Sequence, residues 1–281
     1  MPSFLIATIL LVTIAMTRTD TPDAGAGAMD ALGNEAPVYL ALGDSLAVGA
    51  GASNPERTGY VPLVHSALRE TIPCGTGGDV PCPELQLVNL AEGGATTTSL
   101  LESQLPQALA LIEARNSDDV PGNDVIAITI DIGGNDAVAG VFDACAETVT
   151  ERCPEAVQET LTTISRNLTA ILMQLRAVAG PDTSIAVMTY YNALIGCDYR
   201  HVADNAGLVL EGVPGIMPGL NGVIRQAAER ADVRVADTFG LLLEEDLIGG
   251  ADCLHANDAG YRKIARAFTS VLTADIARRE G

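Results

Sequence analysis

The sequence predicts a single α/β domain in which a parallel five-stranded sheet lies between helices on both of its faces. Short apolar runs of strand length alternate along the chain with longer segments whose apolar residues recur at helical spacing. Two of these runs are followed closely by paired glycines, Gly93–Gly94 and Gly133–Gly134, which is typical of strands that end in tight turns. The 281 residues are enough to bury a full core, and no internal repeat or change of composition divides them.

Five apolar runs are expected to form the sheet, although the pattern leaves their order open. The run Val125–Ile130 is apolar at almost every position, as expected for a strand that is buried on both faces. The five runs cover residues 38–42, 85–90, 125–130, 184–190 and 233–239.

Helical spacing predicts four main helices, at residues 60–72, 100–115, 157–178 and 261–272. The third is the clearest, because its apolar residues recur every three or four positions until Gly180 and Pro181 end it. Residues 197–220, between the fourth and fifth strands, are rich in glycine and proline. We expect them to form a loose insertion that serves as part of a substrate-binding wall.

The beginning of the chain is expected to direct export. Phe4–Met16 is an apolar run of thirteen residues, too short for a comfortable transmembrane span and typical of a signal peptide. Small residues over 24–28 offer cleavage sites, but no Lys or Arg precedes the run, so an uncleaved anchor or a wrongly assigned start stays open. We expect a signal peptide over residues 1–28, a linker over 29–36 and the folded domain over 37–281.

Six cysteines, an even number, agree with an extracytoplasmic protein. Their spacing lacks the C-x-x-C pattern of zinc sites. Six cysteines allow fifteen pairings, of which the local ones are the most economical, and the last two cysteines then remain for each other. The predicted bonds are Cys74–Cys82, Cys145–Cys153 and Cys197–Cys253, with a free thiol at Cys253 as the alternative to the third.

The formal net charge of −20 argues against nucleic acid and anionic membranes as partners, because both would be repelled. We expect no stable membrane span in the mature form. The three histidines are scattered without an H-x-x-x-H pairing, which disfavours a metal-dependent hydrolase.

A serine follows the first predicted strand, Val38–Leu42, at its carboxyl end. Open α/β sheets bind ligands at this edge, so Ser45 is a candidate nucleophile, provided that a base, an orienting group and oxyanion donors accompany it. Gly43, Asp44 and Ser45 also fit an ordinary β-turn, and Ala47 replaces the second glycine of the G-x-S-x-G motif. Asp44 is expected to hold the turn through backbone hydrogen bonds rather than to react.

Three histidines are the candidates for the base. His65 lies in a predicted helix and His201 in the loose insertion, and both fit ordinary structural positions. His255 lies three residues after Asp252 in an expected loop, so the carboxylate can reach the Nδ1–H of the imidazole as a catalytic triad requires. The same spacing also fits the first turn of a helix.

Four blocks of residues resemble, in this order, the SGNH hydrolases of the GDSL esterase/lipase superfamily. They are Gly43–Leu46, Asn89–Thr96, Gly133–Asp136 and Asp252–His255. Each block is weak alone, whereas four in the family's order form a specific match over about residues 38–272. Ala256 is a departure, because many members have proline after the histidine, and the difference concerns the rigidity of the loop.

The resemblance implies the flavodoxin-like, three-layer fold of this family and a role for each matching residue. Ser45 would be the nucleophile, His255 the general base and acid, and Asp252 the residue that orients the histidine. The backbone N–H groups of Ser45 and Gly94 and the side-chain amide of Asn135 would form the oxyanion hole. Taken alone, Asn135 would also fit a helix cap.

We therefore expect a secreted, monomeric serine esterase that forms an acyl-enzyme and uses no metal or organic cofactor. Its substrate would be a small-molecule or lipid ester with a short or medium acyl chain. Carbohydrate O-deacetylase, lysophospholipase and thioesterase activities on the same scaffold stay open, as does a non-catalytic binding domain.

Overall fold

The computed structural model describes residues 36–72, 82, 84–118, 120, 122–145, 152–196, 200–213, 217–250 and 252–280. The predicted signal peptide, and all but the last residue of the predicted linker, lie outside the described residues. The predicted boundary between them therefore stays a prediction.

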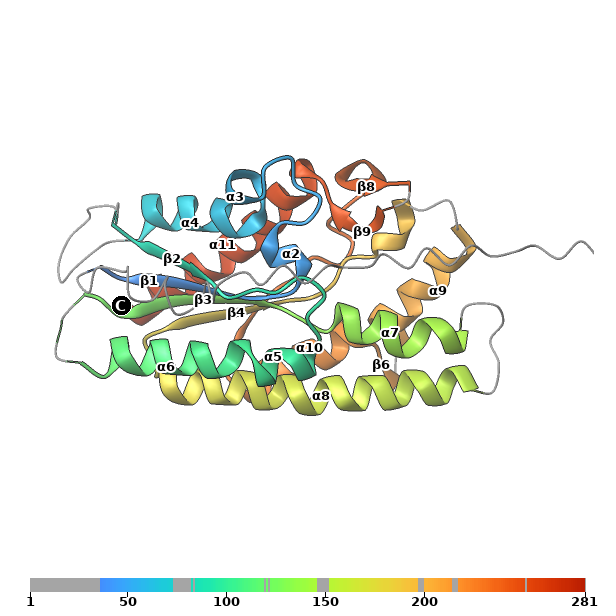
Figure 1. Ribbon diagram of the computed structural model, residues 1–281, viewed down its shortest axis with the longest axis horizontal. Helices are drawn as coiled ribbons and strands as arrows, with labels where there is room; N and C mark the ends of the chain where they lie inside the picture. Colours follow the sequence, from blue (N-terminus) through green and yellow to red (C-terminus); the bar gives the residue numbers. More distant parts are fainter. Residues whose placement is uncertain are drawn as a thin grey trace, which may run out of the picture. The chain divides into compact units, whose positions relative to one another are not determined.

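A parallel five-stranded sheet forms the centre of the domain, which confirms the predicted fold class (Figure 1). The strands lie in the order β2-β1-β3-β4-β7. This is the flavodoxin-like order, and it places the reversal between β1 and β3, where α/β sheets bind ligands beyond the carboxyl ends of the strands. The strands are β1 (Val38–Gly43), β2 (Gln86–Asn89), β3 (Val125–Asp131), β4 (Ser184–Met188) and β7 (Arg234–Ala236).

The core lies on both faces of this sheet. Every residue of β1 and β4 is buried, which explains why these strands are almost continuously apolar. A polar pair inside the core joins β1 to β3, since the hydroxyl groups of Tyr39 and Thr129 lie 2.7 Å apart.

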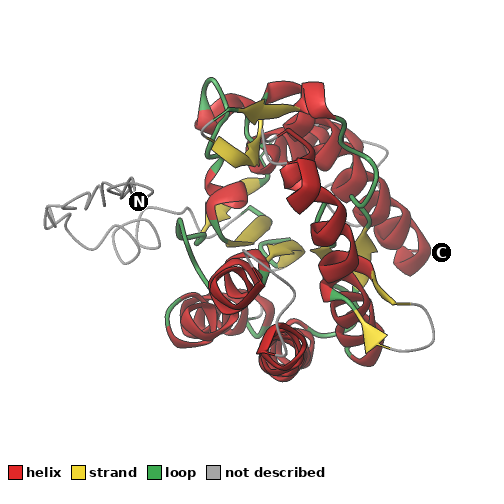
Figure 2. Ribbon diagram, turned by 90° about the vertical axis from the view of Figure 1, so that its right-hand side faces the viewer, coloured by secondary structure: helices red, strands yellow, loops and turns green. Residues whose placement is uncertain are grey.

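Two layers of helices cover the sheet, as Figures 1 and 2 show. One face carries α4 (Tyr60–Thr71) and α11 (Asp258–Glu280). The rings of Tyr60 and Phe268 stack at a centroid distance of 5.0 Å and join these two helices. The other face carries α5 (Thr97–Glu102), α6 (Gln104–Asn116), α8 (Arg152–Ala179) and α10 (Leu220–Arg230).

Several short elements complete the described part of the chain. They are the helices α2 (Ser45–Val48), α3 (Pro55–Thr58), α7 (Gly134–Cys145) and α9 (Arg200–Glu211), the 3₁₀ turns η1 (Ala193–Gly196) and η2 (Glu244–Asp246), and the antiparallel strand pairs β5 (Gly212–Val213) with β6 (Met217–Pro218) and β8 (Leu247–Gly249) with β9 (Asp252–Ala256).

The structure corrects three expectations about these elements. The helix expected over 100–115 is two helices separated at Ser103, and the first of them starts earlier than expected, because Thr96 and Ser99 form a capping box there. The insertion expected to be loose contains α9, since its glycines and prolines are concentrated after residue 211 and leave good helix formers before it. The segment with Asp252 and His255 is the strand β9, not a loop.

The three predicted disulfide bonds stay predictions, because four of the six cysteine side chains lie outside the described residues. These are Cys74, Cys145, Cys197 and Cys253. Of the two described cysteines, Cys82 and Cys153, neither is a free thiol. Among the helices that the structure describes, none combines the length and the apolarity needed to cross a membrane.

Candidate active site

Ser45 lies two residues after the carboxyl end of β1 and is the first residue of α2. Gly43 has a φ of +154°, and a Cβ at this position would collide with the side chain of Asp131, so only glycine lets β1 end here. Asp44 is the N-cap of α2, and its Oδ1 accepts a hydrogen bond of 2.9 Å from the N–H of Leu46. This confirms the expectation that Asp44 holds the turn.

Three side chains form a continuous series of hydrogen bonds at this edge of the sheet. Ser45 Oγ lies 2.9 Å from His255 Nε2, and His255 Nδ1 lies 2.9 Å from each carboxylate oxygen of Asp252. The fold therefore brings together the serine and the histidine, which are 210 residues apart in sequence. These distances are within the range that a general base needs to take the proton of a nucleophile.

The pKa of Asp252 lies below its usual value. Partial burial is the largest single influence and raises this pKa. The hydrogen bonds from the His255 imidazole and from the N–H groups of Leu254 and His255 lower it, and together they outweigh the effect of burial. The carboxylate is therefore ionised at the pH at which a histidine changes its charge, and it can stabilise an imidazolium beside it.

The loop after α2 supports His255 from a second direction. Gly51 has a φ of +87°, and a Cβ there would lie 2.8 Å from the carbonyl oxygen of Ala256 and 2.9 Å from His255 Cβ. Both its conformation and its space therefore require glycine. Asp258, at the start of α11, fixes the same loop by accepting hydrogen bonds from Ser53 N (2.8 Å) and Ser53 Oγ (2.6 Å).

The three predicted oxyanion donors follow β1, β2 and β3. The N–H of Ser45 is at the start of a helix, where backbone donors have no partner within the helix itself. The turn with Gly94 is joined to the end of β1 by a hydrogen bond of 3.1 Å from Glu92 N to Gly43 O. Gly94 has a φ of +77° and open space where a Cβ would be, so a ligand can approach its backbone.

Asn135 lies in the first turn of α7, and its Nδ2 donates a hydrogen bond of 2.9 Å to the carbonyl oxygen of Ala95. This bond fixes the amide beside the Gly94 turn and leaves its second hydrogen for a ligand. The next residue, Asp136, joins α7 to α5, because its carboxylate accepts hydrogen bonds from Thr97 N (2.8 Å) and Thr97 Oγ1 (2.6 Å). Its place in the third block was the only sequence signal for this role.

Sequence reasoning missed a buried acidic cluster next to the Ser45 turn. Asp131 is fully buried at the end of β3, and Asp44 is 3% exposed. Tyr60 OH donates to Asp131 Oδ1, and Tyr190 OH donates to Asp44 Oδ2 at 2.7 Å. The available signal was a carboxylate at the end of an otherwise apolar run.

Of the other two histidines, His65 has a structural position away from this site. His65 Nε2 lies 2.7 Å from Leu85 O and joins α4 to the start of β2, which is the structural position expected for it. His201 belongs to α9, and its side chain lies outside the described residues. Within the described chain, no three His, Cys, Asp or Glu side chains are arranged to hold a metal ion.

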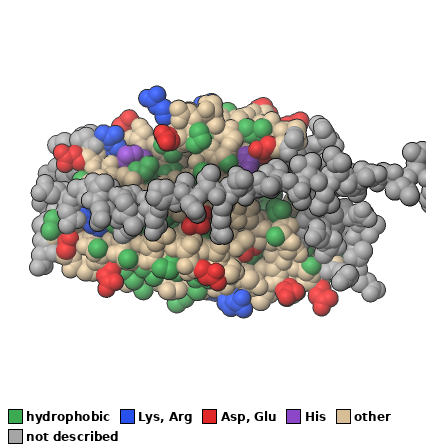
Figure 3. All heavy atoms as spheres, in the orientation of Figure 1, with side chains coloured by type: hydrophobic (Ala, Val, Ile, Leu, Met, Phe, Trp, Pro, Cys, Tyr) green, Lys and Arg blue, Asp and Glu red, His purple; other side chains and the backbone are tan. Residues whose placement is uncertain are grey.

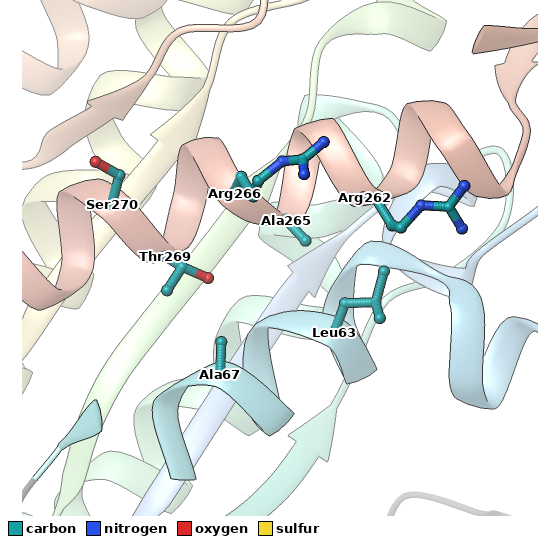
Figure 4. A pocket seen from close by; sticks show the side chains of 7 residues that line it. All are labelled: Leu63, Ala67, Arg262, Ala265, Arg266, Thr269 and Ser270. Atoms are coloured by element: carbon teal, nitrogen blue, oxygen red, sulfur yellow. The ribbon is translucent and has the colours of Figure 1, made fainter. Parts of the chain in front are cut away.

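A separate cavity of about 360 Å³ lies between α4 and α11 (Figure 4). Its lining comprises Leu63, Ala67, Arg262, Ala265, Arg266, Thr269 and Ser270. None of the predicted site residues contributes to it, so it is distinct from the surroundings of Ser45. The face of the molecule in Figure 3 carries many scattered acidic side chains and few basic ones, in keeping with the net charge of −20.

The model of the GDSL-like lipase/acylhydrolase family matches residues 41–263. A search of the curated proteins finds no match. Similar solved structures include the lipase Lip_vut3 from a goat rumen metagenome, with 20% identity, a TM-score of 0.57, and coverage of 83% of this chain and 96% of that one.

Two further structures are about equally similar. Phospholipase A1 from Streptomyces albidoflavus NA297 has 20% identity and a TM-score of 0.55, with coverage of 85% of this chain and 99% of that one. The acetylxylan esterase Axe2 from Geobacillus stearothermophilus has 19% identity and a TM-score of 0.53, with coverage of 85% and 94%. At these identities the similar structures establish only the fold. The family model spans most of the chain and therefore establishes the family. The chain therefore belongs to the GDSL-like lipase/acylhydrolase family and is a carboxylic ester hydrolase.

Proposed function

We propose that the protein is a secreted serine esterase that cleaves carboxylic esters through an acyl-enzyme on Ser45. The observation that carries the proposal is the unbroken series of hydrogen bonds from Ser45 Oγ through His255 to Asp252, with 2.9 Å at each step. A serine hydroxyl is a weak nucleophile on its own, and a neighbouring imidazole held by a carboxylate is what activates it.

In the proposed reaction, Ser45 Oγ attacks the ester carbonyl carbon while His255 Nε2 takes the hydroxyl proton. Asp252 stabilises the imidazolium that results. The carbonyl oxygen, now negatively charged, accepts hydrogen bonds from the N–H groups of Ser45 and Gly94 and from Asn135 Nδ2. His255 then gives its proton to the leaving alcohol as the bond between the acyl carbon and the alcohol oxygen breaks. A water molecule, deprotonated by the same imidazole, attacks the acyl carbon. The bond to Ser45 Oγ breaks, the acid leaves, and His255 returns the proton to Ser45 Oγ.

Two exposed apolar side chains favour a substrate whose acyl group is apolar. Val48 follows Ser45 by three residues on α2 and is 41% exposed, and Val138 follows Asn135 by three residues on α7 and is 44% exposed. Residues three apart share a helix face, so both valines lie on the faces that carry the proposed site groups. They favour an acyl chain longer than acetyl, within the short to medium range expected from the sequence.

Export is part of the proposal. It is supported by the apolar run over residues 4–16 and by the even number of cysteines. The similar structures include a lipase, a phospholipase A1 and an acetylxylan esterase. Lipid esters and acetylated carbohydrates are therefore the two substrate classes that the assay has to separate.

The experiment compares wild type, Ser45→Ala and the control Ser270→Ala, which removes an exposed hydroxyl on α11. Each is assayed with p-nitrophenyl esters from acetate to palmitate and with acetylated xylan, and circular dichroism verifies the fold. We expect Ser45→Ala to lose more than 99% of the activity and Ser270→Ala to retain it.

A fluorophosphonate probe, which labels activated serines, should modify wild type at Ser45 and should not modify Ser45→Ala. Activity of Ser45→Ala above a hundredth of wild type would refute the nucleophile. Absence of hydrolysis by wild type on every ester would favour a non-catalytic binding domain, and a preference for acetylated xylan would favour the deacetylase.

A further inference from the structure

We propose that Asp44 and Asp131 share one proton and act as a positioning pair that holds Ser45 within reach of His255. The inference rests on the proposed role of Ser45, and it adds residues to which no role in the reaction has been assigned.

The two carboxyl groups lie in one site closed to solvent, and a side-chain hydrogen bond between them raises the pKa of Asp131 and lowers that of Asp44. Asp44 also accepts hydrogen bonds from Leu46 N at 2.9 Å and from Tyr190 OH at 2.7 Å. Asp131 accepts from Tyr60 OH and, at 3.3 Å, from the N–H of Asp44. A hydrogen bond between two carboxyl groups requires a proton on one of them. Asp131 is its place in this arrangement, because Asp131 is fully buried and its bond from the N–H of Asp44 is long, at 3.3 Å, whereas Asp44 accepts two bonds of 2.9 and 2.7 Å.

The surroundings of the pair do not compensate two negative charges. The titratable groups that face it from the neighbouring elements are Tyr39, Tyr60, Tyr190, Tyr191, Tyr261 and His255. In the described part of the chain, no Lys or Arg is among the groups that act on the pair. Burial first, and then the negative charge of Asp44, raise the pKa of Asp131 well above its usual value, as expected for two carboxyl groups in one site.

The pair is connected to the serine through the backbone. Asp44 precedes Ser45 and caps the helix that Ser45 begins. Asp131 lies in register with Gly43 at the ends of β3 and β1. Gln104, which is fully buried, clamps the same glycine by accepting from Gly43 N at 2.9 Å and donating to Gly43 O at 2.8 Å. Loss of the shared proton would place two buried negative charges at this turn and would pull Asp44 away from its capping position.

The shared proton makes folding depend on pH in a defined direction. The folded chain keeps a proton that the unfolded chain releases at the ordinary pKa of aspartic acid, so this group favours folding fully only below that value. As the pH rises from there towards the raised pKa of Asp131, the equilibrium constant for unfolding increases about tenfold per pH unit from this group alone. Asp131→Asn keeps the hydrogen bond to Asp44 without a titrating proton, so this component should vanish.

Infrared spectroscopy tests the proton directly and without reference to activity. Wild type at pH 7 should show the carbonyl band of a neutral, buried carboxylic acid, which disappears in Asp131→Asn and persists in the control Asp182→Asn, whose side chain is exposed. If Asp131→Asn does not fold, the test uses wild type alone, in which the same band should disappear at alkaline pH. Absence of the band from wild type at pH 7 would overturn the proposal.

Kinetics tests the positioning role. Asp131→Ala should lower kcat at neutral pH at least tenfold, and Asp131→Asn should recover most of it. Wild type should lose activity reversibly at alkaline pH, and Asp131→Asn should lose it at a higher pH. Identical alkaline limits in the two proteins would refute the positioning role, whereas activity in Ser45→Ala beside an intact infrared band would refute only the proposed function.

Discussion

Gly51 offers a sharp test of how closely the position of His255 is controlled. Gly51→Ala adds one methyl group where φ is +87° and where the new Cβ would lie 2.9 Å from His255 Cβ and 2.8 Å from Ala256 O. A side chain in this left-handed conformation costs about 1–2 kcal/mol. For a domain of this size, that lowers Tm by about 2–8 °C.

The close contact adds a second effect. Ordinary carbon contacts begin at 3.4 Å, so His255 has to move by about 0.5 Å to accept the methyl group. Because a misplacement of about 1 Å can cost about 10²-fold in rate, we expect kcat of Gly51→Ala to fall about tenfold. The 2.9 Å distance from His255 Nε2 to Ser45 Oγ is the quantity that this shift disturbs.

Gly180→Ala is the matched control. Gly180 has a φ of +75° with open space at the Cβ position, and it precedes β4, at the edge of the sheet opposite to Ser45. It should show the same loss of Tm and a wild-type kcat. Thermal unfolding and ester hydrolysis, both measured well below the lower Tm, give the comparison. Equal kcat values for the two variants would refute the argument that Gly51 positions His255.

Asp252→Asn should lower kcat, by up to about 10⁴-fold as in serine proteases, and a change confined to KM would assign Asp252 to substrate binding. Because hydrogen bonds keep the pKa of Asp252 low against the effect of its burial, its charge is lost only as the pH falls through that lowered value. The acid limb of kcat/KM should therefore have the slope of one proton, because Asp252 stays ionised through it, and a slope of two would contradict this. Asn135→Ala should lower kcat by about 10²–10³-fold, whereas an unchanged kcat would leave Asn135 as a helix cap. Mild reduction should lower activity before the fold melts if Cys197 and Cys253 are bonded, and peptide mapping that finds Cys253 free or bonded elsewhere would exclude this bridge.

The strands could be predicted from the sequence because burial on both faces leaves an apolar run that needs no tertiary information. The predicted runs 125–130 and 184–190 differ from β3 and β4 by one or two residues at their ends. The site residues were found for a related reason. Ser45, Gly94, Asn135 and the histidine segment each follow a strand or precede a helix, at places that short motifs mark.

The acidic pair could not be predicted because its chemistry exists only after folding. Asp131 follows the predicted strand 125–130 without any sign of a role, and Tyr190 is the last residue of the predicted strand 184–190. Tyr60, 71 residues before Asp131, looked like an ordinary apolar position of a helix. Nothing in the spacing of these three residues indicates that they meet, since their contact depends on the order of the strands, which the sequence left open.

The separation of 210 positions between Ser45 and His255 in the sequence has a consequence for synthesis. The serine leaves the ribosome when most of the sheet has not yet been made, and its partner follows only with β9. A nascent chain therefore has a hydroxyl that cannot attack an ester. Such a long-range contact is slow to form, so catalytic competence should appear abruptly, as one of the last events in the maturation of each molecule.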